Sequence, residues 1–207
     1  MIVALGTFPN NRVDLNLFIC ILISNRIFIL QSFPTIRTED YLLRQIIETD
    51  LENIFLGLSN PEVIRYYGVS FLTIEETKQQ LEFYRDLEIN STGIWWAICS
   101  LNNDVFYGAI GFNNRNLMHR NAEIGYWLLP QFWGKGIIKN TLPVACNFAV
   151  QELKLHRIVA MIESENIASR KTVEQFGFNY EGTMKECEFK DGRWIDLEIF
   201  AYIKTDF

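Results

Sequence analysis

Three apolar runs of strand length follow one another in the middle of the chain, at residues 94–101, 105–112 and 122–129. The polar residues at 102–104 favour a tight hairpin turn between the first two runs. Residues 113–120 read as a polar loop before the third run. Because strands joined by short connections pair antiparallel, this pattern predicts three sequential antiparallel strands.

The pattern changes after position 136, where apolar residues recur at helical spacing and predict a helix over 137–151. The short apolar run at 156–162 hardly alternates with polar residues, which is typical of a strand buried on both faces. Residues 178–189 and 194–203 are predicted as two closing strands. The dipeptide Asp191-Gly192 between them is a strong hairpin signal.

Polar residues with capping ability mark the starts of four further helices. Thr49 or Asp50 is expected to cap the first and Asn60 the second, while Thr73 begins a capping-box sequence for the third. Asn166 is expected to cap a helix after the buried strand. Predicted strands and helices thus occur together along the chain.

Residues 1–34 differ from the rest of the chain. Their apolar segment at 15–30 is interrupted by Ser24, Asn25 and Arg26, so it is too broken for a membrane span of about 20 residues. No secretory signal pattern is clear. Two interpretations stay open: an added β-hairpin, or upstream sequence outside the usual protein. We divide the chain into an N-terminal extension at 1–34 and one domain at 35–207.

Composition bears on the binding partners of the protein and on the cellular compartment that its cysteines suit. A net charge of −6 over 207 residues argues against a protein that binds nucleic acid by neutralising phosphates. The four cysteines are scattered without a C-x-x-C pair, and there are two histidines, so we expect no metal site. Buried thiols in a reducing cytoplasm are the expected state of the cysteines, and no membrane association is predicted.

Two glycines stand between the third middle strand and the helix at 137–151. Gly134 and Gly136 form a G-x-G at a strand-to-helix junction, where N–H groups and the positive helix end can bind phosphate oxygens. Lys135 between them can add a charged contact. An ordinary tight turn is the alternative. The spacing fits neither a P-loop nor a Rossmann fingerprint.

The flanking sequence resembles the GNAT acetyltransferases over about residues 35–203. The resemblance rests on Glu-Ile-Gly-Tyr-Trp-Leu at 123–128, Gln-x-x-Gly-x-Gly at 131–136, Asn-x-x-Ser at 166–169, Gly-Phe at 177–178 and Glu-Gly at 181–182. It is greatest for the branch that acetylates N-terminal amines of ribosomal proteins. It implies an α+β GNAT fold, a mixed and mostly antiparallel twisted sheet flanked by helices. It also implies acetyl-CoA as co-substrate and direct transfer to a protein α-amine. We expect a monomer or a homodimer. The alternatives are a small amine acceptor, such as a polyamine or an antibiotic, and a non-catalytic CoA-binding module.

The resemblance also assigns residues to the cofactor. The pantetheine arm is expected along the backbone of Trp127, Leu128 and Leu129, with the Asn166 amide as a further contact. Arg170, with Lys171, is expected near the 3′-phosphate, although a solvated helix face is the alternative. The pyrophosphate is expected on Gln131, Phe132, Trp133, Gly134, Lys135, Gly136, Ile137 and Ile138.

Three residues are candidates for proton transfer. Many GNAT enzymes place a tyrosine where this chain has Val173, which leaves Ser169 as the candidate donor to the departing thiolate. Glu188 is favoured over Glu123 as the base that takes the proton of the amine. For either glutamate, a strand-face ion pair is the alternative role.

Overall fold

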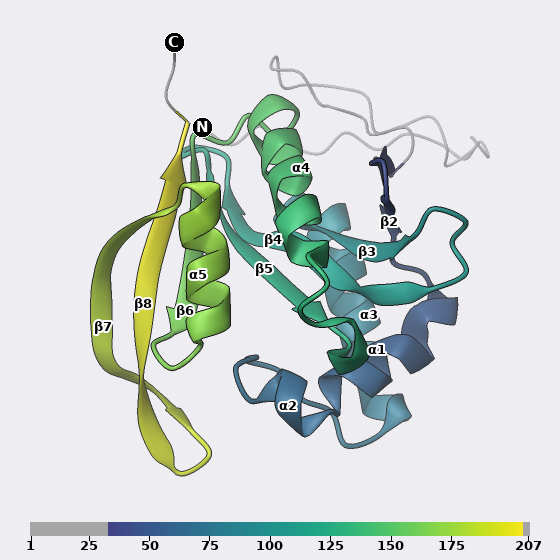
Figure 1. The fold of residues 1–207 in the computed structure, drawn as a ribbon, viewed down its shortest axis with the longest axis horizontal. Coiled ribbons are helices and arrows are strands. Elements are labelled where there is room, and N and C mark those ends of the chain that lie inside the picture. Colours follow the sequence, from purple (N-terminus) through teal and green to yellow (C-terminus); the bar gives the residue numbers. More distant parts are fainter. Residues whose placement is uncertain (1–32, 205–207) are drawn as a thin grey trace, which may run out of the picture. The chain divides into compact units, whose positions relative to one another are not determined.

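Eight strands form one mixed sheet in the part of the chain that the computed structural model describes, residues 33–204 (Figure 1). Their order across the sheet is β1-β2-β3-β4-β5-β6-β8-β7. Neighbours are antiparallel except β5 and β6, which run parallel. The strands are β1 (Ile36–Arg37), β2 (Tyr41–Gln45), β3 (Ile94–Ser100), β4 (Phe106–Asn116), β5 (Asn121–Leu128), β6 (Arg157–Glu163), β7 (Asn179–Lys190) and β8 (Arg193–Ile203).

Helices cover both faces of this sheet, and each face has its own apolar core. One core joins α1 (Leu51–Leu58), α2 (Pro61–Ile64) and α3 (Ile74–Ile89) to the sheet. The other lies beneath α4 (Ile137–Gln151) and α5 (Ile167–Phe176). Short 3-10 turns precede α1 (Glu48–Asp50) and α4 (Pro130–Phe132).

The central strand β3 shows why the sheet needs both layers. Trp96 and Ile98 belong to the core beneath α4, whereas Trp95 and Ala97 belong to the core beneath α1–α3. Because side chains alternate between the two faces of a strand, a run buried at every position must be covered on both sides. The α+β sheet predicted from the sequence is thus confirmed.

Two local predictions are wrong. Residues 113–116, predicted as loop, continue β4, and the turn before β5 is correspondingly shorter. Asp50 precedes α1 but makes no N-cap hydrogen bond to that helix. Its buried carboxylate instead pairs with Arg44 at 2.7 and 2.8 Å and accepts the Ile47 N–H at 2.9 Å. A cation on the neighbouring strand thus takes the oxygens that a cap would use.

The predicted extension at 1–34 lies almost entirely outside the described residues, so its two interpretations stay open. At its end, Phe33 packs edge-on against Trp96, with ring centroids 6.1 Å apart. The Trp96 indole donates to the Pro34 carbonyl at 2.8 Å. Residues 33 and 34 therefore contact the sheet directly.

Candidate active site

β6 is paired along its whole length on one side but only at its start on the other. Within the described sheet, all its residues from Arg157 to Glu163 pair with β8. Toward β5, pairing ends at Glu123 opposite Val159. Beyond that pair the two strands share no ladder, so N–H and C=O groups on their facing edges are left for another partner. We call this opening, between residues 124–128 and 160–163, the slot.

The direction of the β5 backbone decides which groups face the slot. Leu129 donates its N–H to the Tyr107 carbonyl of β4 at 2.9 Å. Because successive residues direct their N–H groups to opposite sides, Trp127 also faces β4, whereas Tyr126 and Leu128 face the slot. Of the backbone predicted to hold pantetheine, only the Leu128 segment is therefore placed toward the slot. The backbone of Tyr126, for which no role was predicted, also faces the slot.

The glycine loop follows the C-terminal end of β5. Gly134 and Gly136 have φ angles of 72° and 77°, in the left-handed region that residues with a Cβ avoid. A Cβ built at either position would meet nothing within 4 Å, so the surrounding protein leaves this space open. In the helix that follows, the first hydrogen bond runs from the Asn140 N–H to the Gly136 carbonyl at 3.1 Å.

The N-terminus of α4 therefore presents free donors at the loop. The N–H groups of residues 137–139 precede the first helical hydrogen bond, and the first turn of this described helix contains no acidic residue. The helix dipole adds partial positive charge at the same place. These features match what a diphosphate needs from a binding site.

Aromatic side chains fix the shape of the loop. The Trp133 indole donates to the Leu128 carbonyl at 2.9 Å, and the Phe132 ring meets the Tyr107 ring edge-on at 4.8 Å. The Lys135 ammonium lies 5.4 Å from the Phe132 ring centroid, close to the helix end. The side chains of Trp127, Leu128, Leu129 and Ile137 are buried, Ile138 is half-buried, and Gln131 is exposed.

Asn166 and Ser169 start α5 together. The Asn166 side-chain oxygen accepts the Ser169 N–H at 3.1 Å, which confirms the predicted cap. The Tyr126 phenol donates to the Ser169 carbonyl at 3.4 Å. Burial raises the pKa of Tyr126 to about 12, so this phenol stays protonated near neutral pH. The Asn166 amide nitrogen makes no hydrogen bond within residues 33–204 and can bind a ligand, whereas the Ser169 side chain also interacts with the Tyr126 phenol.

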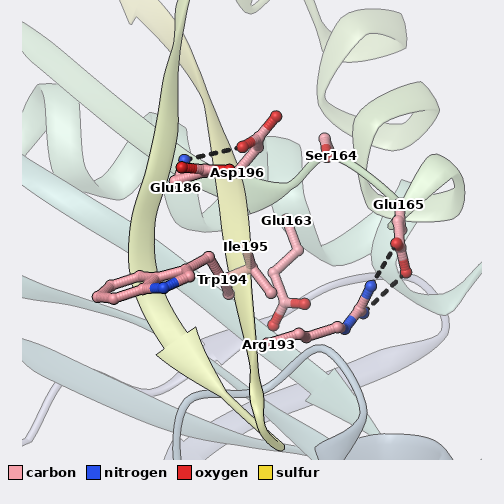
Figure 2. Close-up of a pocket in the computed structure, with 8 residues that line it drawn as sticks. All are labelled: Glu163, Ser164, Glu165, Glu186, Arg193, Trp194, Ile195 and Asp196. Carbon is pink, nitrogen blue, oxygen red and sulfur yellow. Dashed lines mark hydrogen bonds and ion pairs between the residues drawn. The ribbon is translucent and has the colours of Figure 1, made fainter.

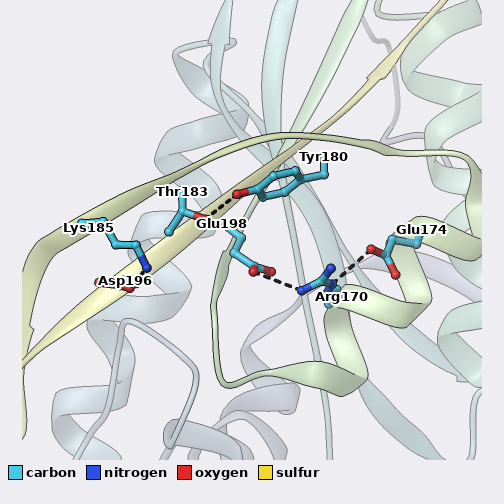
Figure 3. A network of polar contacts seen from close by, with 7 residues as sticks. All are labelled: Arg170, Glu174, Tyr180, Thr183, Lys185, Asp196 and Glu198. Carbon is cyan, nitrogen blue, oxygen red and sulfur yellow. Dashed lines mark hydrogen bonds and ion pairs between the residues drawn. The ribbon is translucent and has the colours of Figure 1, made fainter.

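Arg170 is engaged by carboxylates on α5 and β8 (Figure 3). Its guanidinium pairs with Glu174 at 3.1 Å and Glu198 at 3.2 Å, and it lies 6.0 Å from the Phe200 ring centroid. The hydrogen bond to Glu174 and then the charge of Glu198 raise the pKa of Arg170. These ion pairs use its Nε and one terminal nitrogen, and the side chain remains 40% exposed. They fit the alternative of a helix face, while the contact with the 3′-phosphate stays a prediction.

Glu123 lies on the face of the sheet away from α5. The core beneath α4 and α5 takes alternate residues of β6, including Ile158. Val159 therefore faces the α1–α3 side, and Glu123, its partner across the parallel pair, shares that side. Glu123 is half-buried and stands at the last paired position, where the slot begins.

Glu188 is placed on the same face by the other neighbour of β6. Glu163 alternates with the core residues of β6 and pairs with Leu197 of β8. Ile195 lies two residues from Leu197 and pairs with Glu188, so all four side chains share the α1–α3 side. A bulge between Met184 and Glu188 interrupts the β7 ladder just before this point.

The candidate proton-transfer groups thus lie on opposite faces of the sheet. Glu123 and Glu188 share the face covered by α1–α3, whereas Ser169 belongs to α5 on the other face. Transfer of an acyl group between a thiol and an amine needs a proton acceptor on the attacking side and benefits from a donor on the leaving side. The placement on opposite faces is compatible with these two roles, which stay predictions.

An acidic pocket of about 200 Å³ lies at the end of β6, beside the β7–β8 hairpin (Figure 2). Three of its carboxylates are paired: Glu163 with Lys190, Glu165 with Arg193 and Asp196 with Lys185. The lining residues are Glu163, Ser164, Glu165, Glu186, Arg193, Trp194, Ile195 and Asp196.

The described residues were also compared with the requirements of a metal site and of a membrane span. Among residues 33–204, no three His, Cys, Asp or Glu side chains are grouped so that they could hold a metal ion. None of the described helices has the length and apolar character needed to cross a membrane.

Comparison with known proteins decides the family. The acetyltransferase (GNAT) domain profile matches residues 40–179. The chain belongs to the GNAT family. An uncharacterised N-acetyltransferase of Bacillus subtilis, YoaA, is 32% identical over 173 residues, covering 83% of this chain and 98% of that protein. The Escherichia coli ribosomal-protein-serine acetyltransferase is 33% identical over 100 residues, covering 48% of this chain and 56% of that protein.

Solved GNAT structures share the fold. The ribosomal L7/L12 α-N-protein acetyltransferase RimL in complex with coenzyme A has a TM-score of 0.74 at 24% identity, covering 82% of this chain and 98% of that one. Spermidine N-acetyltransferase from Vibrio cholerae, in complex with CoA and spermine, has a TM-score of 0.72 at 22% identity, covering 80% and 96%. The family confirms that the chain is an N-acetyltransferase with the GNAT fold, rather than a non-catalytic module.

Proposed function

We propose that this N-acetyltransferase moves an acetyl group directly from acetyl-CoA to the α-amine of a protein N-terminus, with a ribosomal protein as the expected acceptor class. The observation that carries the proposal is the slot between β5 and β6, with the glycine loop and the N-terminus of α4 beside it. Acetyl-CoA supplies the acetyl group as a thioester, which is already activated for attack by an amine.

The cofactor is held mainly by backbone in this proposal. The N–H groups at the start of α4 and the turn at Gly134 and Gly136 bind the diphosphate, and Lys135 adds charge. The free backbone groups of β5, those of Tyr126 and the N–H of Leu128, pair with the amide-bearing arm as another strand would. The Asn166 amide nitrogen is a further donor. This part of the site aims the thioester into the slot.

The proton-transfer residues act from the two faces. Glu188, with Glu123 as the competing candidate, accepts a proton from the acceptor's ammonium group so that the neutral amine can attack. The Ser169 hydroxyl donates a proton to the thiolate as it leaves and regains a proton as the attacking nitrogen loses one to form the amide. No covalent intermediate on the protein is needed, because holding the two substrates side by side supplies much of the acceleration.

The acidic pocket favours a peptide terminus over a polyamine. A polyamine carries several positive charges and needs several unpaired carboxylates. Glu163, Glu165 and Asp196 each already hold a cation of the protein, which leaves Glu186 alone in the lining. The pocket is also smaller, at about 200 Å³, than the roughly 300–1,000 Å³ of common small-molecule sites. A single amine at the end of an extended chain requires less space and less charge.

A small amine is the second candidate acceptor, and one relative favours it. The Vibrio cholerae spermidine N(1)-acetyltransferase is 31% identical to this chain over 92 residues, which covers 44% of this chain and 53% of that protein. That match is shorter than the match to YoaA. The two acceptor classes predict opposite substrate preferences, so a direct comparison separates them.

A thiol-release assay with acetyl-CoA tests the proposal. The acceptor panel contains peptides with free N-terminal serine or alanine, the same peptides with blocked N-termini, and spermidine and spermine. We expect turnover with the free peptides and little with their blocked forms or the polyamines. Faster turnover of spermidine would replace the proposed acceptor, and no turnover with any amine would contradict the assignment.

A further inference from the structure

The end of the β7–β8 hairpin extends beyond the strand that supports it. β6 pairs with β8 only as far as Glu163 opposite Leu197, whereas the hairpin continues through the pairs Glu188–Ile195 and Lys190–Arg193. The last part of the hairpin is therefore a two-stranded ribbon, preceded by the bulge in β7. An isolated two-stranded ribbon is only marginally stable, so this one needs contacts outside the ladder to hold its position.

Lys190 provides such contacts. Its ammonium donates to the Arg65 carbonyl at the end of α2, at 2.6 Å, and also pairs with the Glu163 carboxylate. One side chain thus joins the ribbon, the end of β6 and the α2 segment, which is 125 residues away in sequence from Lys190. Figure 1 shows the hairpin end lying toward α2.

The Lys190 pair is better shielded from water than the neighbouring pair. The Lys190 and Glu163 side chains are 21% and 9% exposed, whereas Arg193 and Glu165 are 50% and 49% exposed. Exposed ion pairs are screened by solvent and contribute little, while breaking a shielded pair leaves a charge without a partner. Lys190 is therefore the stronger tether, and Arg193 is its natural control.

Lys190 and Glu188 occupy the same face of β7, two residues apart, because both pair with residues of β8 on the α1–α3 side. We propose that Lys190 is a positioning residue: by bridging Glu163 and the Arg65 carbonyl, it fixes the ribbon that carries Glu188 on the α1–α3 face of the sheet. This inference rests on the proposed function, in which Glu188 acts on the acceptor amine.

The test compares Lys190→Met with Arg193→Met in the full chain. Amide hydrogen exchange over residues 186–196 measures how often the ribbon opens, because exchange reports local opening. Steady-state kinetics measure the effect on kcat, with the peptide that the wild-type enzyme acetylates fastest. Calorimetry measures the affinity for CoA. A Lys190→Arg variant restores the charge.

We expect Lys190→Met to exchange about tenfold faster in the ribbon and to lose about tenfold in kcat, while CoA affinity stays within about twofold. Lys190→Arg should recover part of the loss, and Arg193→Met should change ribbon exchange and CoA affinity less than about threefold. Equal exchange in the two methionine variants, or unchanged exchange or unchanged kcat in Lys190→Met, would overturn the inference. If the wild-type enzyme acetylates no amine, the proposed function fails, while the exchange comparison still decides whether Lys190 tethers the ribbon.

Discussion

The proposed cofactor site and the proposed acceptor site use different kinds of groups. On the proposed cofactor side, the groups that matter are backbone: a glycine turn, the first N–H groups of α4 and the unpaired edge of β5. On the proposed acceptor side they are side chains from separate segments, including Glu123, Glu163 and Glu188. A backbone site is altered by changing conformation, whereas a side-chain site is altered by changing one functional group. Substitutions on the two sides should therefore have separable effects.

The largest effect is expected from Glu188→Gln. Removing the proton acceptor without changing the shape of the side chain should lower kcat by about 100-fold and leave CoA affinity unchanged. Steady-state kinetics with a peptide acceptor and calorimetry with CoA measure the two quantities. Glu152→Gln is the control, since Glu152 is an exposed glutamate at the C-terminal end of α4, outside the pocket and the slot. If Glu123→Gln costs more than Glu188→Gln, the base is Glu123.

Gly136→Ala should act on the cofactor side alone. The added Cβ strains a left-handed turn by about 1–2 kcal/mol and intrudes on the space beside the loop, so we expect CoA affinity to fall about 30-fold. Gly192→Ala is a matched control, because its φ of 79° is nearly that of Gly136 at 77° and its Cβ also meets nothing within 4 Å. Calorimetry should show normal CoA binding in the control. Equal losses in both variants would indicate general strain.

Ser169→Ala tests the donor on the α5 face, and its effect should be smaller. We expect kcat to fall about tenfold, since a thiolate departs readily even without a proton donor. The cap should survive, because Asn166 accepts from the backbone N–H of Ser169 and not from its hydroxyl. Thr172→Ala on the same helix is the control. A normal kcat in Ser169→Ala would remove Ser169 from the mechanism.

The smallest effect concerns stability at high pH. Burial raises the pKa of Tyr84 from 10.0 to about 12 and that of Cys99 from 9.0 to about 11. Their neutral forms are favoured in the folded state, so the unfolded chain loses protons first. The free energy of unfolding should be unaffected by these groups below pH 9 and should fall between about pH 9 and 12. Urea titrations from pH 8 to 11 measure this, and Tyr84→Phe should flatten the decrease. Stability that rises with pH would contradict this interpretation.

The same contrast explains what could be predicted from the sequence. Helix α4 was predicted over 137–151 and is found at Ile137–Gln151, because periodicity and a glycine boundary are local signals. The Asn166 cap was predicted for the same reason. The capping role of Asp50 was not correct, because Arg44 from the neighbouring strand takes its carboxylate.

The acceptor side depends on contacts that no local pattern contains. The bridge from Lys190 to Arg65 joins residues 125 positions apart, and the partners of Arg170 lie on α5 and β8. Which residues of β5 face the slot follows from pairing register, which the sequence could not supply. The Tyr126 contact with Ser169 was missed for that reason, although Tyr126 lies within the segment that carries the family resemblance.

The central claim is that backbone groups of the loop and of β5 bind CoA. Backbone amide NMR shifts during titration with CoA test it most directly, because they report on each N–H separately. We expect the largest changes at Gly134, Gly136 and residues 137–139, with further changes at Tyr126 and Leu128, while the amides paired between β6 and β8 stay unchanged. Binding of CoA with unchanged amides at the loop and along β5 would contradict the account.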